Sequence, residues 1–423
     1  MKIILWSINY APEPTGIAPY NRELAEFLAS RGHDVSAVTT FPYYPQWRKE
    51  PGDLRRWHRA EVVGAVHVHR CWCYVPAVAT SFRRILHELS FGVVSALRLI
   101  ALPRADVYVV VSPPLGLGFF AWVVTALKGS RYVFHVQDLQ PDAAVRLGMI
   151  RQSWLVRALY GLERLAYAKA MAVSGISKGM IAAFQRKGVP AGKCVLLPNW
   201  LRLAVPTRGR DRAADRRSFG VAPDAMLAIY SGNLGRKQDL DVLIKAAALI
   251  PAGRPALHVI IAGFGAARAD LEACLREHPY GGVELLPLLD DDRYAALLNA
   301  ADVALITQAA GTGQFFFPSK LLSVLAAGLP VVAVADVASE LARAVRSGEF
   351  GVVVSPGNAA GLAIVLHDLA QSRGQLTGWA EHTDWVQQFS REAILPRFEN
   401  MLLMAARNRR VLPAVEPRAP APA

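Results

Sequence analysis

Short, continuous apolar runs alternate with amphipathic stretches along most of this sequence. The first half contains four such runs: Lys2–Ile8, Val35–Thr40, Val107–Val111 and Arg131–Val136. Continuous apolar runs are typical of strands buried on both faces of a parallel sheet. Between the first two runs, Tyr20–Ser30 places its apolar residues on one helical face, and Gly32 follows it as a helix-ending glycine. The chain therefore begins as strand, loop, helix, strand.

The same alternation returns after residue 224. The pattern predicts strands at Leu227–Ser231, His258–Ala262, Val283–Leu286, Val303–Ile306 and Val331–Val334. It predicts helices between them at Asp239–Leu249, Arg268–Arg276, Tyr294–Ala300 and Lys320–Ala327. Strands that alternate with helices form right-handed βαβ units on parallel sheets. We therefore expect an α/β protein with two Rossmann-like domains whose parallel sheets face each other across a cleft.

The domain boundaries follow from changes in composition. We place an N-terminal domain at 1–201, a polar and basic linker at 202–223, and a C-terminal domain at 224–378. A helical segment is expected at 379–407, and the Pro/Ala-rich stretch 408–423 is expected to be a disordered tail.

Charge is distributed unevenly between the two halves. The 47 Lys/Arg and 34 Asp/Glu give a net charge of +13, and residues 1–205 carry 25 of these cations against 12 anions. The rest of the chain is neutral, so the basic half should meet something anionic. Within it, Ser81–Leu102 is expected either to lie on a membrane surface or to be a core helix under the first sheet.

Several protein classes are excluded. No apolar stretch reaches the ~18–20 residues that span a bilayer, and the N-terminus is not that of a secretory signal, so we expect a cytoplasmic protein, peripheral on the inner face of the plasma membrane. Four scattered cysteines indicate core thiols, and no residues have metal-ligand spacing. Asp290–Asp292 fits the start of a helix better than a metal site. Signatures of P-loops, serine hydrolases and nucleic-acid-binding modules are missing.

Two loops of the first half contain candidate functional residues. Gly16, in the loop after the first strand, permits close backbone approach to a phosphate or sugar, although a simple turn explains it equally well. His135 and Asp138 lie at the end of another apolar strand, where a proton acceptor or hydroxyl-binding group is typical of α/β sites. A buried core histidine is the alternative for His135.

Three loops of the second half suit a phosphate. The stretch 230–238 offers Gly232, Asn233, Arg236, Lys237 and Gln238 at the entrance of a helix, and an ordinary surface loop is the alternative. Gly263 and Gly265 form an isolated G-x-G, which is a weak signal. Ser319 is predicted to cap the helix that begins at Lys320, where free amides and the lysine charge favour an anion.

Together these stretches resemble a known family, the retaining family 4 glycosyltransferases of GT-B fold, and especially those of colanic-acid and other exopolysaccharide biosynthesis. The matching residues are Asn9–Gly16, Pro42–Pro45, Gln137–Asp142, Ser174–Met180, Leu197–Trp200, Ser231–Gly235, Lys237–Gln238, Pro318–Lys320 and Ala326–Pro330. Their order and spacing over nearly the whole chain carry the resemblance.

The resemblance implies roles for individual residues. Donor contacts fall on Gly16, Gly232, Asn233, Arg236, Lys237, Gln238, Gly263, Gly265, Ser319, Lys320, Leu321 and Glu340. Acceptor contacts fall on Glu13, Thr15, Tyr43, Tyr44 and Asn199, and catalytic roles on His135, Asp138, Lys237 and Lys320. Two departures stand out: Asn233 and Gln238 replace the family's Arg and Lys, and Phe315 and Ser323 replace its two Glu residues.

The function implied is transfer of a sugar, with retention of configuration, from a nucleoside-diphosphate sugar to a polyprenyl-diphosphate-linked glycan acceptor in exopolysaccharide, capsule or O-antigen synthesis. Positive charge at helix N-termini would stabilise the leaving diphosphate, so no metal or other cofactor is expected. The expected partners are the nucleotide sugar, the lipid-linked acceptor and an anionic membrane surface, but no nucleic acid. A non-catalytic sugar-nucleotide sensor and a GT-B epimerase remain as alternatives.

Overall fold

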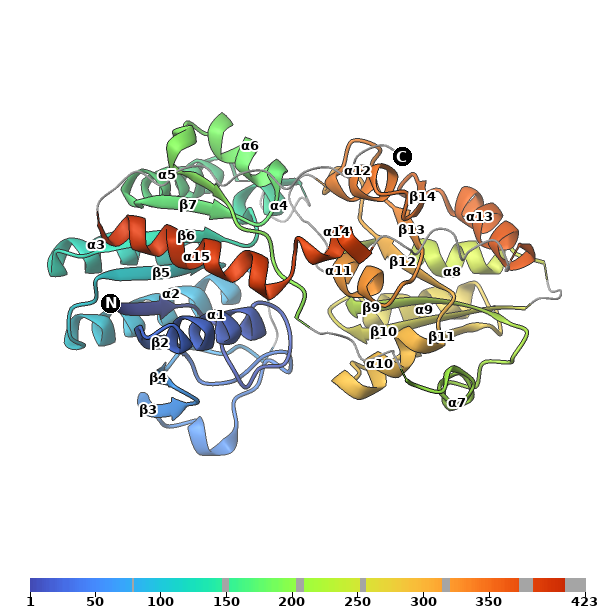
Figure 1. The fold of residues 1–423 in the computed structure, drawn as a ribbon, viewed down its shortest axis with the longest axis horizontal. Helices are drawn as coiled ribbons and strands as arrows, with labels where there is room; N and C mark the ends of the chain where they lie inside the picture. The colour runs from blue at the N-terminus through green and yellow to red at the C-terminus, as the bar shows by residue number, and fades with distance from the viewer. Residues whose placement is uncertain are drawn as a thin grey trace. The chain divides into compact units, whose positions relative to one another are not determined.

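The computed structural model divides the chain into two compact α/β units, shown in Figure 1. It describes residues 1–77, 80–146, 152–202, 209–251, 256–313, 320–372 and 383–407. Among the described residues, the first unit contains Met1–Asn199 together with 392–407, and the second contains Trp200–Arg391. The predicted α/β class with two parallel-sheet domains is confirmed.

The first unit is built on an eight-stranded sheet of order β3-β4-β2-β1-β5-β6-β7-β8. The strands are β1 Lys2–Trp6, β2 Asp34–Thr40, β3 His58–Val63, β4 Val66–Cys71, β5 Val107–Ser112, β6 Arg131–Val136, β7 Ala172–Gly175 and β8 Cys194–Leu196. Only β3 pairs antiparallel among these described strands. The central strands β1, β5 and β6 are almost wholly buried, as their continuous apolar runs predict.

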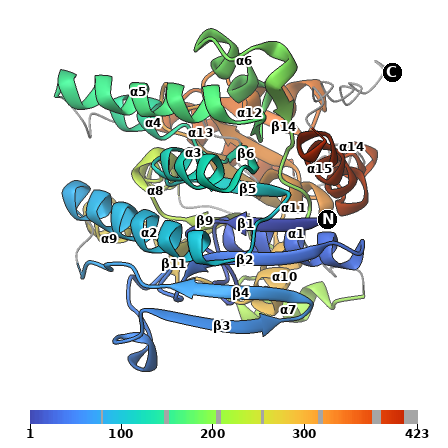
Figure 2. The same cartoon turned by 90° about the vertical axis from the view of Figure 1, so that its left-hand side faces the viewer.

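Helices cover both faces of this sheet. They are α1 Ala18–Ser30, α2 Ser81–Ala101, α3 Leu117–Lys128, α4 Gln140–Arg146, α5 Ser153–Lys169, α6 Lys178–Arg186 and, from the far end of the chain, α15 Arg391–Ala406. Short 3-10 turns occupy Pro51–Asp53 and Ala191–Lys193. Figure 2 shows α2, α3 and α5 side by side on one face, with α1 and α15 on the other. Right-handed crossovers that run in opposite directions from β1 produce this division.

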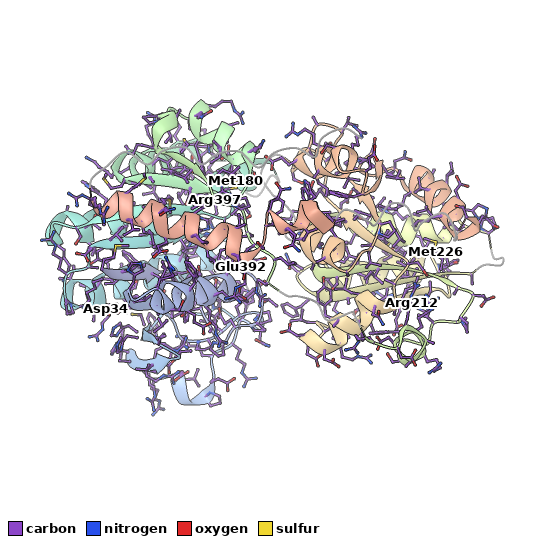
Figure 3. All side chains as sticks on the ribbon, viewed as in Figure 1. Asp34, Met180, Arg212, Met226, Glu392 and Arg397 are labelled. Atoms are coloured by element: carbon purple, nitrogen blue, oxygen red, sulfur yellow. The ribbon has the colours of Figure 1, made fainter. Side chains whose placement is uncertain are left out.

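The C-terminal helix α15 completes the first unit. Its Glu399 carboxylate accepts hydrogen bonds from Arg31 Nε at 3.1 Å and pairs with His33 Nε2 at 3.0 Å. Arg397, labelled in Figure 3, donates from Nη2 to the Leu196 carbonyl at 2.9 Å. The Phe398 ring packs edge-on against His135, with 4.8 Å between the ring centroids. Contacts to the ends of α1, β8 and β6 therefore fix this helix to a sheet made by the first half of the chain.

The second unit has a fully parallel six-stranded sheet among its described strands, of order β11-β10-β9-β12-β13-β14. The strands are β9 Met226–Asn233, β10 Leu257–Phe264, β11 Val283–Leu286, β12 Val303–Thr307, β13 Val331–Val334 and β14 Gly351–Val354. The helices are α7 Arg212–Ser218, α8 Asp241–Ala248, α9 Arg268–Glu277, α10 Asp291–Ala300, α11 Lys320–Ala326, α12 Glu340–Ser347, α13 Ala359–Gln371 and α14 Thr383–Gln387, with a 3-10 turn at Arg236–Gln238. Apolar cores fill both sides of the sheet.

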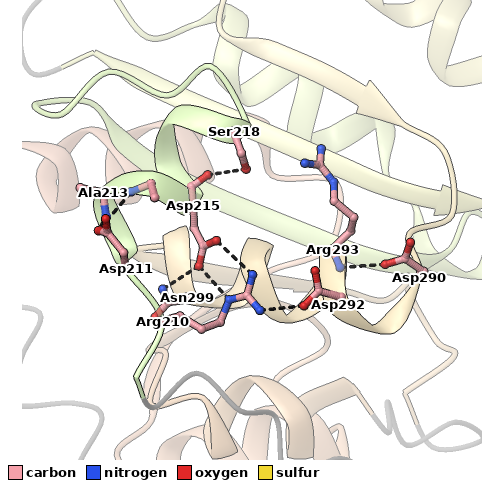
Figure 4. A network of polar contacts seen from close by, with 10 residues as sticks. Arg210, Asp211, Ala213, Asp215, Ser218, Asp290, Asp292, Arg293 and Asn299 are labelled. Atoms are coloured by element: carbon pink, nitrogen blue, oxygen red, sulfur yellow. Dashed lines mark hydrogen bonds and ion pairs between the residues drawn. The ribbon is translucent and has the colours of Figure 1, made fainter.

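The predicted linker 202–223 is too long. Within it, α7 packs on α10 as part of the second unit, and Phe219 and Val221 enter that unit's core. Figure 4 shows the polar contacts that hold this helix. Arg210 pairs with Asp215 at 2.9 Å and with Asp292 at 2.8 Å, while Asn299 donates to Asp215 at 2.8 Å. Ion pairing to Arg210 lowers the pKa of Asp215. Because paired cations stabilise this segment, its basic composition does not mark a linker.

The predicted helical segment 379–407 also differs from the structure. It contains two helices that belong to different units, because α14 packs on α11 and α15 joins the first unit. The predicted disordered tail 408–423 lies outside the described residues.

Two smaller predictions are confirmed. The Asp290 side chain caps α10 by accepting a hydrogen bond from Arg293 N at 2.8 Å, so the Asp290–Asp292 run is a helix start. All four cysteines are buried and unpaired. Across the described ranges, no helix is both long enough and apolar enough to cross a membrane.

We expect Phe398→Ala to destabilise the first unit by ~3–5 kcal/mol, because a fully packed aromatic ring is lost and a cavity remains. Urea unfolding should show the loss in the transition of that unit alone. The matched control is Ile364→Ala on α13, where the side chain is 63% exposed and the change should stay within ~0.5 kcal/mol. Equal effects of the two substitutions would contradict the role assigned to α15.

Candidate functional site

The candidate donor-site residues of the second unit gather at the carboxyl edge of its sheet. Loops after β9, β10 and β12 meet there, because parallel strands all end at the same edge. Ala309 N donates to the Lys237 carbonyl at 2.9 Å, which joins the β12 loop to the β9 loop. Leu234 N donates to the Phe264 carbonyl at 2.9 Å, which joins the β9 and β10 loops. Three of the predicted loops therefore form one surface.

Lys320 is the central charged group of this surface. Its Nζ is buried, lies 3.6 Å from the centroid of the Tyr230 ring, and has no hydrogen-bond partner within the described part of the chain. A Cβ added to Gly232 would stand 3.0 Å from the same nitrogen. Burial first, and then the charge of Lys237, lower the pKa of Lys320 to about 7. A buried ammonium group beside a second cation is costly unless an anion joins it.

Gly263 and Gly265 are needed for close packing of backbone. A Cβ on Gly263 would stand 1.8 Å from the Gly232 carbonyl oxygen, and one on Gly265 would stand 2.2 Å from the Leu234 carbonyl oxygen. Gly263 also has φ near +156°, which L-residues rarely adopt. Whatever they contribute to a ligand, these glycines first let the β10 loop lie against the β9 loop.

The turn Arg236–Gln238 is locked from within. Gly235 N donates to Gln238 Oε1 at 3.1 Å, so this side chain turns back to cap its own turn. Its amide oxygen is therefore occupied by the protein. Arg236, which is exposed, and Lys237, which is half-buried, lie on the same turn, within the loop that meets Lys320. The structure thus favours these two cations over Gln238 as groups facing a phosphate.

Other predicted donor residues are placed as follows. The Leu321 side chain is fully buried in the core, which leaves only its backbone for a ligand. Ser323 Oγ bonds the Lys320 carbonyl at 2.9 Å and the Tyr294 hydroxyl at 2.8 Å. Glu340 is the first residue of α12, which Ser339 caps through Ala342 N at 3.0 Å. Ser319 and Phe315 lie outside the described residues.

The loop after β12 brings Glu340 to the same edge. Gly311 N donates to Asp336 Oδ2 at 2.6 Å, beyond the end of β13. Gly313 lies against Ser339, since an added Cβ would stand 2.4 Å from the Ser339 Cβ. The beginning of α12 is therefore adjacent to the β12 loop, and a second helix N-terminus joins that of α11 at this edge.

In the first unit, Glu13 organises the predicted acceptor loops. It is 4% exposed; its Oε1 accepts hydrogen bonds from Tyr43 N and Tyr44 N, both at 3.0 Å, and its Oε2 accepts one from Asn9 Nδ2 at 2.8 Å. Burial raises the pKa of Glu13, and these three donors oppose that rise. Through these hydrogen bonds the Glu13 carboxylate holds the 42–45 loop against the 9–16 loop.

Other side chains of these loops are more open to a ligand. Gly16 is exposed, has φ near +67°, and lies beside the Tyr44 ring. Thr15 Oγ1 is buried without a partner among the described residues.

Arg70, which sequence reasoning missed, donates to the carbonyls of Ala11 at 2.7 Å and Thr40 at 3.2 Å. It also pairs with the Glu61 carboxylate at 2.5 Å. No local signal marks its contacts to the two loops, because those partners are backbone groups distant in sequence.

His135 is enclosed by protein groups. Its Nδ1 lies 2.9 Å from Ser174 Oγ and its Nε2 lies 2.7 Å from Gln137 Nε2. Burial lowers the pKa of His135 to about 3, so the ring is neutral. This geometry favours the alternative of a buried core histidine.

Gln137 and Asn199 form a reciprocal amide pair, with both hydrogen bonds at 3.0 Å. The pair joins the end of β6 to the last residues of the first unit, so Asn199 is held in place by a partner that His135 also contacts. Asp138 follows on the same loop and is half-buried. Of the residues predicted on this loop, Asp138 is therefore better placed than His135 to meet a ligand.

Glu88 on α2 is a second residue that sequence reasoning missed. Its carboxylate accepts a hydrogen bond from Gln140 Nε2 at 3.3 Å, and Gln140 Oε1 accepts one from Leu115 N at 2.6 Å. Burial raises the pKa of Glu88 to about 7, against the opposing effects of Gln140 and Arg84. The Gln137–Asp142 loop is thus tied to α2 through a carboxyl group that titrates near neutrality. Within the described ranges, no three His, Cys, Asp or Glu side chains are grouped to hold a metal ion.

Comparison with known proteins covers both units. Residues 15–200 match the family described as glycosyl transferase 4-like domain, and residues 226–372 match glycosyl transferases group 1. The putative colanic acid biosynthesis glycosyl transferase WcaI of Escherichia coli K12 is 33% identical over 350 residues, which cover 81% of this chain and 85% of that protein.

Solved structures agree on the fold. Sucrose-phosphate synthase from Thermosynechococcus elongatus superposes with a TM-score of 0.76 at 18% identity, covering 96% of this chain and 98% of that one. Anabaena HepE in complex with UDP and glucose gives 0.71 at 18% identity, covering 95% and 99%. WaaG, a glycosyltransferase of lipopolysaccharide biosynthesis, gives 0.70 at 17% identity, also covering 95% and 99%.

We expect Lys320→Met to weaken binding of inorganic pyrophosphate by tenfold to a hundredfold, since a charge-assisted hydrogen bond contributes ~1.5–3 kcal/mol. In the wild type, binding should weaken as pH rises above about 7, because the neutral amine attracts anions poorly. Isothermal titration across pH would measure both effects. Pyrophosphate affinity that is equal in both proteins would contradict the assignment of Lys320.

The same variant should change the pH dependence of stability. Between pH about 7 and the ordinary value of 10.5, unfolded wild type holds a proton that the folded protein has released, so its stability rises with pH. Lys320→Met lacks that proton and should be more stable at pH 7 by on the order of 2–4 kcal/mol, with little dependence on pH in this window. Lys245→Met, which removes an exposed ion pair with Asp241, is the matched control and should change stability by less than ~1 kcal/mol.

Proposed function

Because this chain belongs to the glycosyltransferase family whose 4-like and group 1 domains match its two units, we propose that it transfers a sugar from a nucleoside-diphosphate sugar to a lipid-linked glycan acceptor, with retention of configuration. The predicted family resemblance is confirmed by these matches. The process we assign to it is the synthesis of an exopolysaccharide or a similar surface glycan, by analogy with the relative named for colanic acid biosynthesis.

The observation that carries the donor assignment is the buried Lys320 ammonium group. It lies at the edge where the β9, β10 and β12 loops meet, and Lys237 is near it. The Lys320 Nζ has no hydrogen-bond partner among the described residues. A diphosphate supplies negative charge to this ammonium group. Structures of a similar fold contain UDP or UDP with glucose, which supports a nucleotide sugar as the donor here.

The proposed chemistry needs charge stabilisation more than proton transfer. As the bond from the anomeric carbon to the leaving oxygen breaks, negative charge grows on the diphosphate and positive charge on the sugar ring. Preorganised cations at that position lower the barrier, because they need no reorganisation during the reaction. Lys320 is the group most affected by the growing negative charge. A nearby anion raises its lowered pKa and so favours the protonated, positively charged form. If the acceptor attacks from the face that the leaving group vacates, configuration is retained without a protein nucleophile.

The first unit supplies the proposed acceptor loops. Glu13 and Asn9 fix the 9–16 and 42–45 loops together, and Gln140 holds the Gln137–Asp142 loop on α2. Between these anchored backbones, Thr15, Tyr44 and Asp138 offer hydroxyl and carboxylate groups suited to sugar hydroxyls. The basic composition of this half supports an acceptor that carries a polyprenyl diphosphate, and with it a position at the inner membrane surface.

A second candidate function is a sensor that binds a nucleotide sugar without turning it over. Ser323, which stands where the wider family has a glutamate, is engaged with Tyr294 and contributes no carboxylate. A GT-B epimerase would also use the same donor loops. Product analysis separates the three: transfer gives a glycosylated acceptor, epimerisation gives an isomeric nucleotide sugar, and a sensor gives neither.

The test begins with a panel of nucleotide sugars ranked by thermal shift, since a ligand that binds only the folded protein raises its melting temperature. The best binder is then incubated with polyprenyl-diphosphate-linked acceptors. At saturating donor, Lys237→Ala and Lys320→Ala should each lower the transfer rate by at least about tenfold, or ~1.4 kcal/mol of barrier.

Lys245→Ala provides the control, because that lysine pairs with Asp241 on the surface of α8. Nuclear magnetic resonance of the product should show the same anomeric configuration as the donor. A loss of less than tenfold in both lysine variants would overturn the charge-stabilisation role, and inversion at the anomeric carbon would overturn retention.

A further inference from the structure

Helix α2 has an apolar stripe on its outer side. Successive turns expose large apolar side chains, of which Phe82 is 74% exposed and Leu97 is 63% exposed. The remaining members of the stripe are Leu86, Leu89, Val93 and Ile100. Their spacing of three and four residues keeps them on one side of the helix for about 27 Å. A soluble surface rarely exposes such a long apolar row.

The opposite side of α2 already has its packing partners. Ser95 Oγ accepts a hydrogen bond from the Trp6 indole at 2.9 Å, Phe91 and Leu99 are fully buried, and Gly92 lies against the ring of Phe120 on α3. One face of the helix therefore packs in the core of the first unit, and a second apolar face is exposed to solvent. Of the two roles expected for Ser81–Leu102, packing under the first sheet accounts only for the inner face.

The charges around the stripe are almost all positive. Helices α2, α3 and α5, which share this face of the sheet in Figure 2, carry seven Lys/Arg and two Glu residues. Neither carboxylate is exposed: Glu163 is buried and paired with Lys187, and Glu88 is half-buried against Gln140. The neighbouring helices add exposed apolar groups of their own, Leu127 at 68% and Trp154 at 65%.

We propose that this surface, the α2 stripe with the cations of α2, α3 and α5, docks on an anionic lipid bilayer. Leucine, valine and phenylalanine side chains enter the boundary between headgroups and acyl chains, while arginine and lysine pair with lipid phosphates. A second copy of this chain fits less well, because two copies of a mainly positive surface would repel each other. The partner is therefore the membrane.

The inner side of α2 contacts loops of the candidate site, and this links the docking surface to the proposed function, on which the link rests. His87 Nδ1 lies 2.5 Å from the Tyr74 carbonyl, and its ring packs against Tyr43 with 4.7 Å between centroids. Glu88, the next residue, binds Gln140 of the Gln137–Asp142 loop. One helix thus touches the bilayer on one side. On the other side it contacts the predicted acceptor loop 42–45 and the Gln137–Asp142 loop with the predicted catalytic Asp138, which suits a lipid-linked acceptor.

Docking is tested with the full chain and vesicles of phosphatidylcholine with or without phosphatidylglycerol, in the absence of donor and acceptor. Wild type should co-sediment with the vesicles that contain phosphatidylglycerol. Leu89→Gln/Leu97→Gln should bind them at least about tenfold more weakly, because two apolar side chains no longer enter the lipid. Leu249→Gln/Ile364→Gln, at positions 58% and 63% exposed on the second unit, is the matched control and should bind like wild type.

A charge variant checks the electrostatic part independently. Arg83→Gln/Arg157→Gln should lose about fivefold in vesicle affinity for each cation removed, and high salt should reduce the difference. Unchanged binding by the Leu89/Leu97 variant would overturn the proposal, as would failure of wild type to bind anionic vesicles. A wild-type dimer that this variant dissociates, without vesicle binding, would assign the surface to a second copy. Transfer to a water-soluble acceptor analogue is measured separately, so a failed glycosyltransferase function and a failed docking surface give different results.

Discussion

Backbone groups of buried parallel strands can bond only to neighbouring strands, and this constraint decides where polar chemistry can occur in both units. In the first unit β1, β5 and β6 are almost wholly buried, and in the second most residues of β9, β10 and β12 are buried as well. Most polar side chains that could bind a ligand therefore lie in the loops. Because the strands are parallel, the loops that follow them lie at one edge of each sheet. The candidate donor groups and the candidate acceptor groups are two outcomes of this one arrangement.

Continuous apolar runs made the central strands, the α/β class and the two-unit division predictable from sequence. The hairpin of β3 and β4 was not, because His67 and His69 alternate with valines in β4, which lies between the edge strand β3 and β2, and so no continuous apolar run marks it. Helix α7 was hidden for a different reason, since its amphipathic pattern depends on arginines that ion pairs hold in place. Local composition cannot reveal a charge whose partner lies about 80 residues away.

The same limit applies to the sites. Motif spacing predicted which loops would form the sites, but it could not say which members are available to a ligand and which support the loop. Glu13, Gln238 and His135 have their polar atoms occupied by protein groups, whereas the Lys320 ammonium group has no partner among the described residues. Glu88 was overlooked because its significance depends on Gln140, a contact between distant segments. Separating ligand-binding groups from supporting groups required tertiary structure.

The position of α15 has a consequence for how this protein is made. The helix begins at Arg391, after every strand of both sheets, yet its Ile394, Leu395 and Phe398 are buried in the unit that leaves the ribosome first. During translation, the face of the first sheet that α15 covers stays exposed while the entire second unit is synthesised. Such an apolar face is a natural binding site for a ribosome-associated chaperone. The unit that emerges first is thus the last to be completed, and a truncation before Arg391 would leave it permanently unfinished.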